Sequence, residues 1–280
     1  MHENVVVSAD WLADRLDGPD EVTVVDVRDA WEYDGIGHVP GAVNIPFEEF
    51  RSGGDADEGM LPGADAWADL LGEAGVSADD TVVAYDDTHG VFAARFLVTA
   101  ECYGHEALHL LDGDYSSWMR DHETSSEAPE IEPTTYEVRT VHGTAEGASG
   151  TVAGSRESEE SPLVGREAVE DAMDDPDAVI VDTRDDWEFE EGHVPGAVNL
   201  DWRELVDEGT RGLKPRAELE SILADHGVTP DKRVVLYCNT ARRISHTYVV
   251  LSSLGYDRLA FYEGSLTEWE AVGGPIETGS

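Results

Sequence analysis

The sequence predicts an α/β protein made of two copies of one domain, each a mainly parallel sheet flanked by helices on both faces. Three observations support this fold class. The length of 280 residues suits about two domains. Short runs rich in Val and Ile alternate with helical patterns, which is typical of a buried, mainly parallel sheet. The second half of the chain also repeats the first at an offset of about 155 residues.

The repeat consists of four blocks that recur in the same order. In the first copy they are Val25–Tyr33, Gly37–Ile45, Val82–Asp86, and Asp112–Gly113 with Trp118; in the second they are Val181–Phe189, Gly192–Leu200, Val234–Cys238, and Glu263–Gly264 with Trp269. We therefore expect homologous domains at residues 1–125 and 163–280. The acidic, Gly/Ser/Thr-rich stretch 126–162 cannot bury enough apolar surface to offset its ordering entropy, and we expect a linker there.

Each copy is predicted to contain three principal strands joined through helices. The predicted strands are Val22–Asp26, Thr81–Tyr85, Ala107–Leu111, Ala178–Asp182, Arg233–Tyr237 and Arg258–Tyr262. The predicted helices are one that follows an N-cap at Ser8, then Ala64–Ala74, Val91–Cys102, Arg166–Met173, Pro215–Asp225 and Ile244–Leu254. Thr134–Val141 alternates slightly, which predicts an edge strand.

The charge is strongly negative, with 61 acidic residues, 18 basic residues and a formal net charge of −43. Such a surface repels phosphate backbones and anionic lipids, so we expect neither nucleic acid nor a membrane as a partner. Acidic residues recur along nearly the whole chain, which favours a halophilic-type protein adapted to molar salt. The alternative is an acidic protein that works in ordinary salt. The first ten residues lack a signal-peptide pattern, so we expect a cytoplasmic protein with free thiols.

Cys238 lies where a buried strand is predicted to end and a helix to begin near Arg243 or Ile244. Backbone N–H groups of such a loop, together with the helix N-terminus, favour a thiolate. Arg242 and Arg243 add positive charge suited to an anionic substrate. The alternative interpretation is that Cys238 is a small buried apolar side chain, which is the usual state of a free cysteine. Cys102, at the end of an apolar helix, fits that second interpretation.

These motifs resemble the rhodanese domain, and the whole chain is similar to tandem-domain rhodaneses of the thiosulfate or 3-mercaptopyruvate sulfurtransferase type. The resemblance rests on the Asp-x-Arg block with Gly-His-Val-Pro-Gly-Ala, present twice, on the six-residue loop Cys238–Arg243, and on the spacing from Gly264 to Trp269. It covers the chain except the linker.

The resemblance implies a sulfurtransferase that moves a sulfane sulfur from thiosulfate or 3-mercaptopyruvate to a thiophilic acceptor, such as cyanide or a thiol. The sulfur would travel as a Cys238 persulfide, in ping-pong fashion and without a cofactor or metal. In the first copy Asp86 stands in place of the cysteine, so that copy is expected to be catalytically inactive. The resemblance implies substrate-binding roles for Asn239, Thr240, Ala241, Arg242 and Arg243, while Arg184 and Arg95 are further candidates.

Other repeated residues are expected to hold the fold. The resemblance implies that Arg28 and Arg184 pair with buried carboxylates, and that His38 and His193 fix a loop. The repeat-matched tryptophans are expected in the core: Trp31, Trp118, Trp187 and Trp269.

The loop departs from the family pattern in ways that leave the donor open. Its fourth position is commonly Gly and is Ala241 here, which costs about 1 kcal/mol if that position needs a positive φ. Asn239-Thr240 matches neither the thiosulfate type nor the mercaptopyruvate type. A Cdc25-like phosphatase is disfavoured, since it needs Cys-x5-Arg and the loop is Cys-x4-Arg. A non-catalytic persulfide carrier that delivers sulfur to an acceptor protein stays open.

Overall fold

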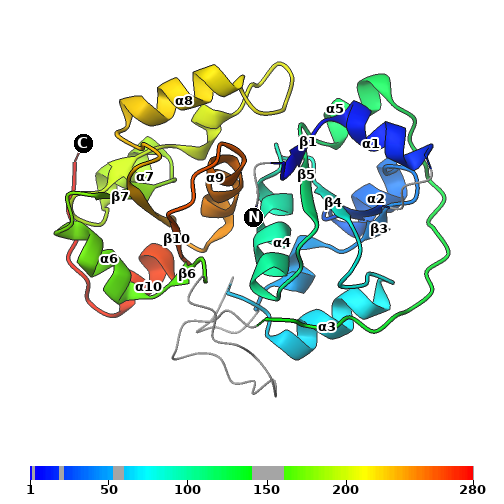
Figure 1. Cartoon of the computed structure of the whole chain (residues 1–280), viewed down its shortest axis with the longest axis horizontal. Coiled ribbons are helices and arrows are strands. Elements are labelled where there is room, and N and C mark those ends of the chain that lie inside the picture. Colours follow the sequence, from blue (N-terminus) through cyan, green and yellow to red (C-terminus); the bar gives the residue numbers. More distant parts are fainter. Residues whose placement is uncertain (2–3, 19–21, 53–59, 141–160, 280) are drawn as a thin grey trace.

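The computed structural model describes residues 1, 4–18, 22–52, 60–140 and 161–279, and contains two parallel five-stranded sheets with the same strand order (Figure 1). The first sheet runs β1-β5-β4-β2-β3 and the second β6-β10-β9-β7-β8. The strands of the first are β1 (Val6–Val7), β2 (Thr23–Asp26), β3 (Val43–Asn44), β4 (Val82–Tyr85) and β5 (Leu108–Leu111). Those of the second are β6 (Leu163–Val164), β7 (Ala178–Asp182), β8 (Val198–Asn199), β9 (Arg233–Tyr237) and β10 (Leu259–Tyr262).

Helices connect the strands in both domains, as the predicted fold class requires. The first domain has α1 (Ala9–Leu16), α2 (Ala30–Ile36), the short 3-10 helix η1 (Phe47–Phe50), α3 (Ala64–Glu73), α4 (Val91–Cys102) and α5 (Tyr115–Asp121). The second has α6 (Arg166–Met173), α7 (Asp186–Glu191), η2 (Trp202–Leu205), α8 (Arg216–Asp225), α9 (Arg242–Ser253) and α10 (Ser265–Ala271). None of the helices in the described part is long and apolar enough to cross a membrane.

The six predicted strands are all present, and their limits agree to within one residue. They form the centre of each sheet, where continuous Val and Leu runs are buried on both faces. Ser8 caps α1 as expected, since its hydroxyl accepts a hydrogen bond from the Trp11 N–H at 3.1 Å. The four outer strands have two residues each and carry no periodicity that a sequence pattern could show.

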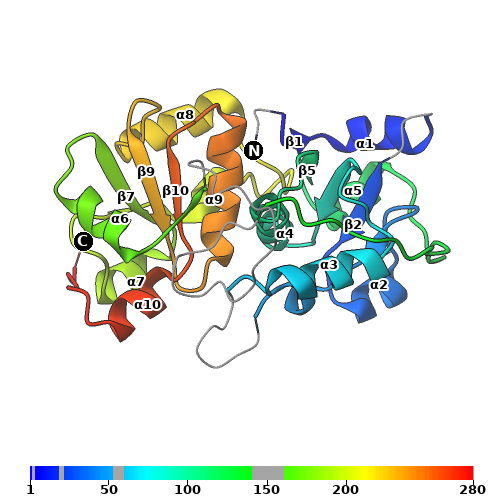
Figure 2. The same ribbon diagram turned by 60° about the horizontal axis from the view of Figure 1, so that its bottom comes forward.

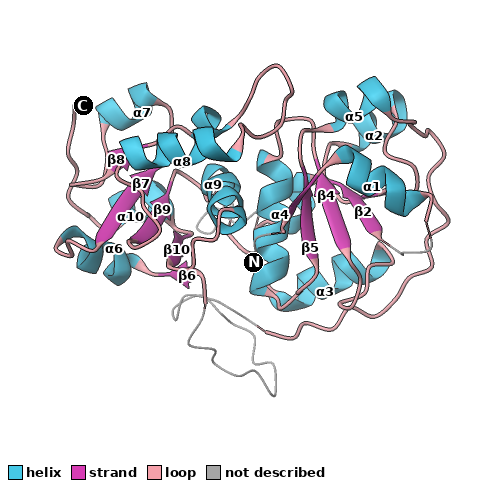
Figure 3. Cartoon of the chain, turned by 45° about the horizontal axis from the view of Figure 1, so that its top comes forward, coloured by secondary structure: helices cyan, strands magenta, loops and turns pink. Residues whose placement is uncertain are grey.

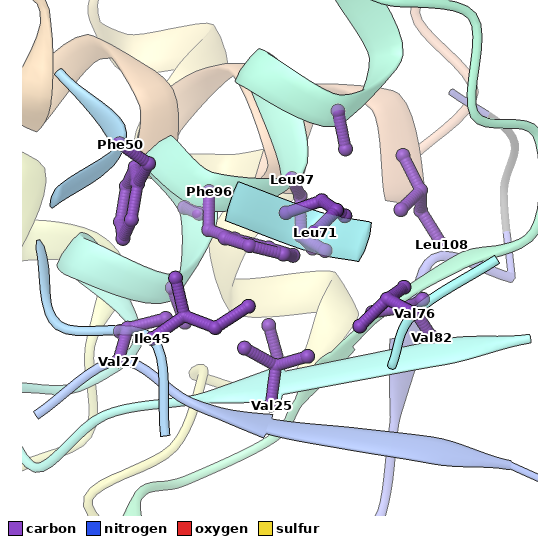
Figure 4. Close-up of a cluster of buried hydrophobic side chains, with 14 of the residues drawn as sticks. Val25, Val27, Ile45, Phe50, Leu71, Val76, Val82, Phe96, Leu97 and Leu108 are labelled. Atoms are coloured by element: carbon purple, nitrogen blue, oxygen red, sulfur yellow. The ribbon is translucent and has the colours of Figure 1, made fainter. Parts of the chain in front are cut away.

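Each sheet packs its apolar side chains against the helices that cover it. In the first domain, Val25, Val27 and Val82 from the strands meet Phe96 and Leu97 of α4 in one cluster of buried side chains (Figure 4). In the second domain, Leu236 of β9 and Ile244 of α9 belong to the matching cluster, which also contains Cys238. The loop between β9 and α9 is therefore anchored at both ends in a packed core.

The repeated Asp-x-Arg blocks form the buried ion pairs that were expected. Arg28 pairs with Asp26 at 2.5 Å and Arg184 with Asp182 at 2.6 Å. Both arginines also donate to a loop carbonyl, Arg28 to Gly37 at 2.7 Å and Arg184 to Gly192 at 2.6 Å. Each pair thus ties the end of a central strand to the Gly-His loop of its own domain.

The histidines of those loops are buried and stack on an aromatic ring of the preceding helix. His38 lies 3.8 Å from Tyr33 and His193 3.7 Å from Phe189, measured between ring centroids. Their expected role in holding the loop is confirmed.

The prediction for the repeat-matched tryptophans is wrong for two of the four. Trp118 and Trp269 are buried, but Trp31 is 64% exposed and Trp187 is 60% exposed. The latter two lie in the first turns of α2 and α7, on the side opposite the buried Tyr33 and Phe189. Repetition in both copies did not distinguish a core position from a repeated surface position.

The segment that follows the first domain begins against that domain. Tyr136 is buried, and its hydroxyl lies 3.1 Å from the Nδ1 atom of His105. The backbone N–H of Thr134 donates to Gly72 of α3 at 2.9 Å. The edge strand predicted at Thr134–Val141 is wrong for its described residues, 134–140, which have no regular secondary structure. The rest of the predicted linker, residues 141–160, lies outside the described residues.

Helices α4 and α9 lie side by side between the two sheets and form the centre of the domain interface (Figures 1 to 3). Arg95 of α4 pairs with Glu263 of the second domain at 2.5 Å, and both side chains are at most 5% exposed. Because both charges are buried, breaking the pair by removing one partner would be strongly destabilising. The pair therefore joins α4 to the turn between β10 and α10.

Candidate active site

Cys238 follows β9 directly and begins the loop that leads into α9. Its side chain is 1% exposed. The backbone N–H of Cys238 donates to the Ser265 hydroxyl at 3.1 Å, and its carbonyl accepts from Leu266 N–H at 3.0 Å. Both contacts tie the loop to the start of α10, so the cysteine has a fixed position.

The loop turns into α9 through Ala241, whose φ of 65° and ψ of −5° lie in the left-handed region. The positive φ that the family pattern implied at this position is present, and it is carried by a residue with a side chain. The helix begins at Arg242, two residues before the predicted helix Ile244–Leu254. Among the described residues, no acceptor oxygen or nitrogen receives a hydrogen bond from the backbone N–H groups of residues 239–244. These donors are available to a bound anion.

Glu188 of α7 holds the loop from outside and was missed by the sequence analysis. It forms an ion pair with Arg243 and accepts a hydrogen bond from the Asn239 side-chain amide at 2.8 Å. Burial raises the pKa of Glu188, but the hydrogen bond and charge of Arg243 outweigh burial and bring the pKa to about 2. Arg243 is thus neutralised within the protein. The sequence repeat did not indicate that Glu188 would bind the loop. Glu32, at the equivalent position of the first domain, takes part in the capping box of its own helix.

Arg184 contributes to the site through Asn239. Its guanidinium is held by Asp182, and one remaining nitrogen lies 3.4 Å from the Oδ1 atom of Asn239. The side chain of Asn239 is therefore fixed from two sides, by Arg184 and by Glu188. Thr240 is half-buried in the loop and has no side-chain hydrogen bond among the described residues.

Arg242 lies against the other domain. Its guanidinium is 5.0 Å from the ring centroid of Phe92, at the start of α4. It forms no ion pair with the described residues. Burial lowers the pKa of Arg242, and the neighbouring charge of Arg243 acts in the same direction. A desolvated cation without a carboxylate partner would gain from a bound anion.

Arg95 is placed in the domain interface by its ion pair with Glu263. Cys102, at the end of α4, is fully buried, and burial raises its pKa well above the usual range. This agrees with its predicted packing role.

The corresponding loop of the first domain shows how this fold receives an anion. Asp86, which replaces the cysteine, is 1% exposed. Its carboxylate accepts hydrogen bonds from the backbone N–H groups of Thr88, Gly90, Phe92 and Ala93 at 2.7 to 3.0 Å. The loop amides therefore converge on the side chain that follows the central strand. By the internal symmetry of the chain, the side chain of Cys238 occupies the matching position.

A segment of the second domain covers the mouth of the loop that contains Asp86. Arg211, held at a φ of 68°, pairs with Asp114 at 2.7 Å and donates to the carbonyl of Asp87 at 3.1 Å. Its own carbonyl lies 3.1 Å from the Nδ1 atom of His89. The first domain's loop is thus filled from within by Asp86 and covered from outside by Arg211.

Comparison with known proteins agrees with the repeat and the fold. A sequence model of the rhodanese-like domain matches residues 8–121 and 166–272. The thiosulfate sulfurtransferase of Pseudomonas aeruginosa is 32% identical over 276 residues, which span 95% of this chain and 93% of that protein. The sulfur carrier protein TtuD of Thermus thermophilus is 31% identical over 293 residues, which span 99% of this chain and 98% of that protein.

A solved structure of similar size also matches the whole molecule. SseA from Escherichia coli, described as having the rhodanese fold and the catalytic mechanism of 3-mercaptopyruvate sulfotransferases, aligns with a TM-score of 0.77 and 28% sequence identity. The match covers 94% of this chain and 98% of that one.

Proposed function

The chain belongs to the rhodanese family as a tandem of two rhodanese-like domains, and we propose that it transfers sulfur through a persulfide on Cys238. It is a sulfurtransferase, since curated thiosulfate sulfurtransferases are similar to it over nearly its whole length. The observation that carries the role of Cys238 is the pair of loops: one gathers four N–H groups on Asp86, and the other offers Cys238 at the same place.

In the first step, the Cys238 thiolate attacks the outer sulfur of thiosulfate. A bond forms between the two sulfur atoms, the bond to the sulfonate sulfur breaks, and sulfite leaves with that electron pair. The product is a Cys238 persulfide anion. Backbone N–H donors and the N-terminus of α9 stabilise the negative sulfur, because they are fixed in place before the reaction.

In the second step, a thiophilic acceptor such as cyanide attacks the outer sulfur of the persulfide. Thiocyanate forms and the Cys238 thiolate is regenerated, so charge and electrons balance without a cofactor. The two half-reactions share one site, which predicts ping-pong kinetics.

The protein's own groups hold this loop for both steps. Glu188 binds Arg243 and Asn239, and Asn239 also contacts Arg184, so these residues act as positioning residues. Arg242, with its half-buried guanidinium, is the cation left for the sulfonate of the donor. We favour thiosulfate over 3-mercaptopyruvate as the donor, because the curated relatives over the full length are mostly thiosulfate sulfurtransferases.

A sulfur-carrier role is the second candidate, and one observation favours it. The chain is similar over nearly its full length to the sulfur carrier protein TtuD. A carrier would accept one sulfur and release it to a partner protein rather than to free cyanide.

The test is sulfur loading followed by turnover. After exposure to thiosulfate, mass spectrometry should find about +32 Da on the peptide that contains Cys238. Addition of cyanide should remove that mass and give thiocyanate at a steady rate. The matched control variant is Cys102→Ala, because it removes the other thiol of the chain. Cys238→Ser should abolish loading, whereas Cys102→Ala should load and turn over normally.

Loading without thiocyanate formation would indicate a carrier. Loading that persists in Cys238→Ser would refute the assignment of the cysteine.

A further inference from the structure

The two Gly-His loops are closed by the same backbone pairing. His38 exchanges two hydrogen bonds with Ser125 at 2.8 Å, and His193 exchanges two with Glu277 at 2.9 Å. In the first domain, the carbonyl of Glu127, two residues after Ser125, lies 3.2 Å from the Nε2 atom of His38. The first domain therefore gives the outer nitrogen of its histidine a partner from the segment that pairs with the loop.

His193 of the second domain lacks that second contact. Its Nδ1 atom lies 2.8 Å from the carbonyl of Phe189, so Nδ1 carries a proton and Nε2 of the neutral ring is an acceptor. Among the described residues, no donor lies within hydrogen-bonding distance of Nε2. The Oε2 atom of Glu277 is 3.9 Å away, which is too far for a hydrogen bond. The ring is only 6% exposed, and a buried acceptor of this kind calls for a donor.

His193 and Glu277 line a pocket of about 590 Å³ whose polar groups are mainly acceptors. Asp225, the last residue of α8, and Asn199 of β8 also line it. The side-chain amide of Asn199 donates to two backbone carbonyls, which leaves its Oδ1 atom to meet a ligand. None of the described residues that line the pocket is Lys or Arg. The pocket therefore favours a ligand that brings both positive charge and N–H donors.

The rest of the pocket wall is apolar. It is formed by Phe189, Ala197 and Val198, and the ring of Phe189 stacks on that of His193 with centroids 3.7 Å apart. Such a surface favours a short alkyl chain. A bare metal ion fits less well, since the described residues hold no cluster of three side chains suited to bind one.

We propose that this pocket binds a small aliphatic primary ammonium ion, with the ammonium group between Nε2 of His193 and the carboxylate of Glu277. Two acceptors 3.9 Å apart can both lie about 2.9 Å from one nitrogen. An ammonium group has three N–H donors and a positive charge, so it serves both acceptors at once. The alkyl chain lies against the apolar wall. The site is separate from sulfur transfer, because none of its residues belongs to the Cys238–Arg243 loop.

The direct test is titration of the full chain with butylammonium chloride, followed by NMR of the imidazole nitrogens. The titration is run at a fixed high KCl concentration, which screens the diffuse attraction of cations to the acidic surface. The Nε2 signal of His193 should be that of an unprotonated nitrogen in the free protein and should move toward a hydrogen-bonded value as butylammonium binds. The neutral compound 1-butanol has a similar shape and should bind about tenfold more weakly.

Glu277→Gln removes the charge but keeps an oxygen to accept the hydrogen bond from the Gly196 N–H at 3.2 Å. It should raise the Kd for butylammonium about three- to tenfold, the range expected for one partly exposed charge, and leave the Kd for 1-butanol unchanged. Asp225→Asn, at an exposed position, should weaken butylammonium in the same direction. Asp171→Asn is the matched control variant, because it removes an exposed carboxylate of α6 outside the pocket, and it should leave both constants unchanged.

Equal affinity for butylammonium and 1-butanol overturns the proposal, and so does an equal loss of butylammonium affinity in Glu277→Gln and Asp171→Asn. A His193 ring that is protonated at both nitrogens in the free protein at neutral pH also overturns it, because Nε2 would then be a donor to Glu277. None of these measurements involves Cys238, so they stand whether or not that residue takes up sulfur.

Discussion

Glu188 connects the stability of the Cys238–Arg243 loop to pH. Its carboxylate accepts hydrogen bonds from Asn239 and Arg243, and its pKa of about 2 lies well below the ordinary value of 4.5 for this carboxyl group. A lowered carboxyl pKa in the folded state adds stability that is complete above about pH 4.5 and is lost as the pH falls toward 2. With allowance for its partial exposure, this amounts to about 1–3 kcal/mol.

Glu188→Gln should therefore lower the free energy of unfolding by about that amount at pH 7 and by much less near pH 2. Urea unfolding of both proteins across this pH range measures the difference. Glu190→Gln, an exposed position on the same helix, is the matched control and should show no such trend. If Glu188→Gln lowered the free energy of unfolding by the same amount at every pH, the ion pair would not be the source of the loss.

Asp86 stabilises the inactive loop as a built-in anion. Asp86→Ala would leave four backbone N–H groups without their acceptor, at a cost of about 2–4 kcal/mol in unfolding free energy. Sulfur transfer should survive, because the proposed catalytic thiol, Cys238, belongs to the other domain. Added sulfate should recover more stability in Asp86→Ala than in the parent chain, as an anion refills the loop. Equal stability of parent and variant in urea, without sulfate, would contradict the role of Asp86.

At the scale of single residues, the sequence predicted the site residues that stand out in a local pattern. Cys238 stood out because it follows a strand and precedes a helix, and Ala241 because the family pattern places Gly there. Glu188 and Phe92 could not be predicted, since their contacts join residues 55 and 150 positions apart in the chain. The ion pair of Arg95 could not be predicted for the same reason, since its partner Glu263 lies 168 residues away in the chain.

At the scale of elements, both strand-to-helix turns before α4 and α9 use a left-handed residue. Gly90 has a φ of 84° and Ala241 a φ of 65°. A Cβ added at Gly90 would lie 3.3 Å from Leu110 Cδ1 and Cδ2, in a conformation that L residues avoid. Gly90→Ala should therefore destabilise the first domain by about 1–2 kcal/mol.

Gly35→Ala is expected to change the free energy of unfolding in the opposite direction and serves as the comparison. Gly35 lies inside α2, and a Cβ there meets nothing within 4 Å. The substitution should stabilise the protein by about 0.5–1 kcal/mol, because Ala favours the helix over the unfolded chain. Chemical unfolding of the two variants side by side measures both effects. Stabilisation by Gly90→Ala would show that the turn is not left-handed.

The elements that the sequence predicted well are those with a strong apolar period. The buried central strands agree within a residue, while β1, β3, β6 and β8 are too short to carry a pattern. Trp31 and Trp187 were misjudged because a large apolar residue near an N-cap was assigned to the core by repetition alone. The residues after Thr134 pack through one side chain, Tyr136, and therefore do not form the strand that their alternation predicted.

At the scale of the whole molecule, the two domains have diverged around one interface. Helices α4 and α9 are equivalent in the repeat and face each other, yet one follows Asp86 and the other Cys238. Arg211 of the second domain covers the loop that contains Asp86, and Phe92 of the first domain packs against Arg242 at the start of α9. Each domain thus contacts the strand-to-helix region of the other.

The net charge of −43 gives the whole molecule a strong dependence on salt. The Debye length falls from about 30 Å at 0.01 M to about 3 Å at 1 M, so repulsion between acidic groups across both domains is screened only at high ionic strength. Repulsion is larger in the compact state than in the expanded one. The unfolding free energy should therefore rise between 0.01 M and 1 M KCl, and sulfur transfer should rise with it. Sucrose at matched osmolarity is the control, because it favours compact states without screening charge. A protein that loses stability in KCl, or that gains as much from sucrose, would not owe its salt response to its acidic surface.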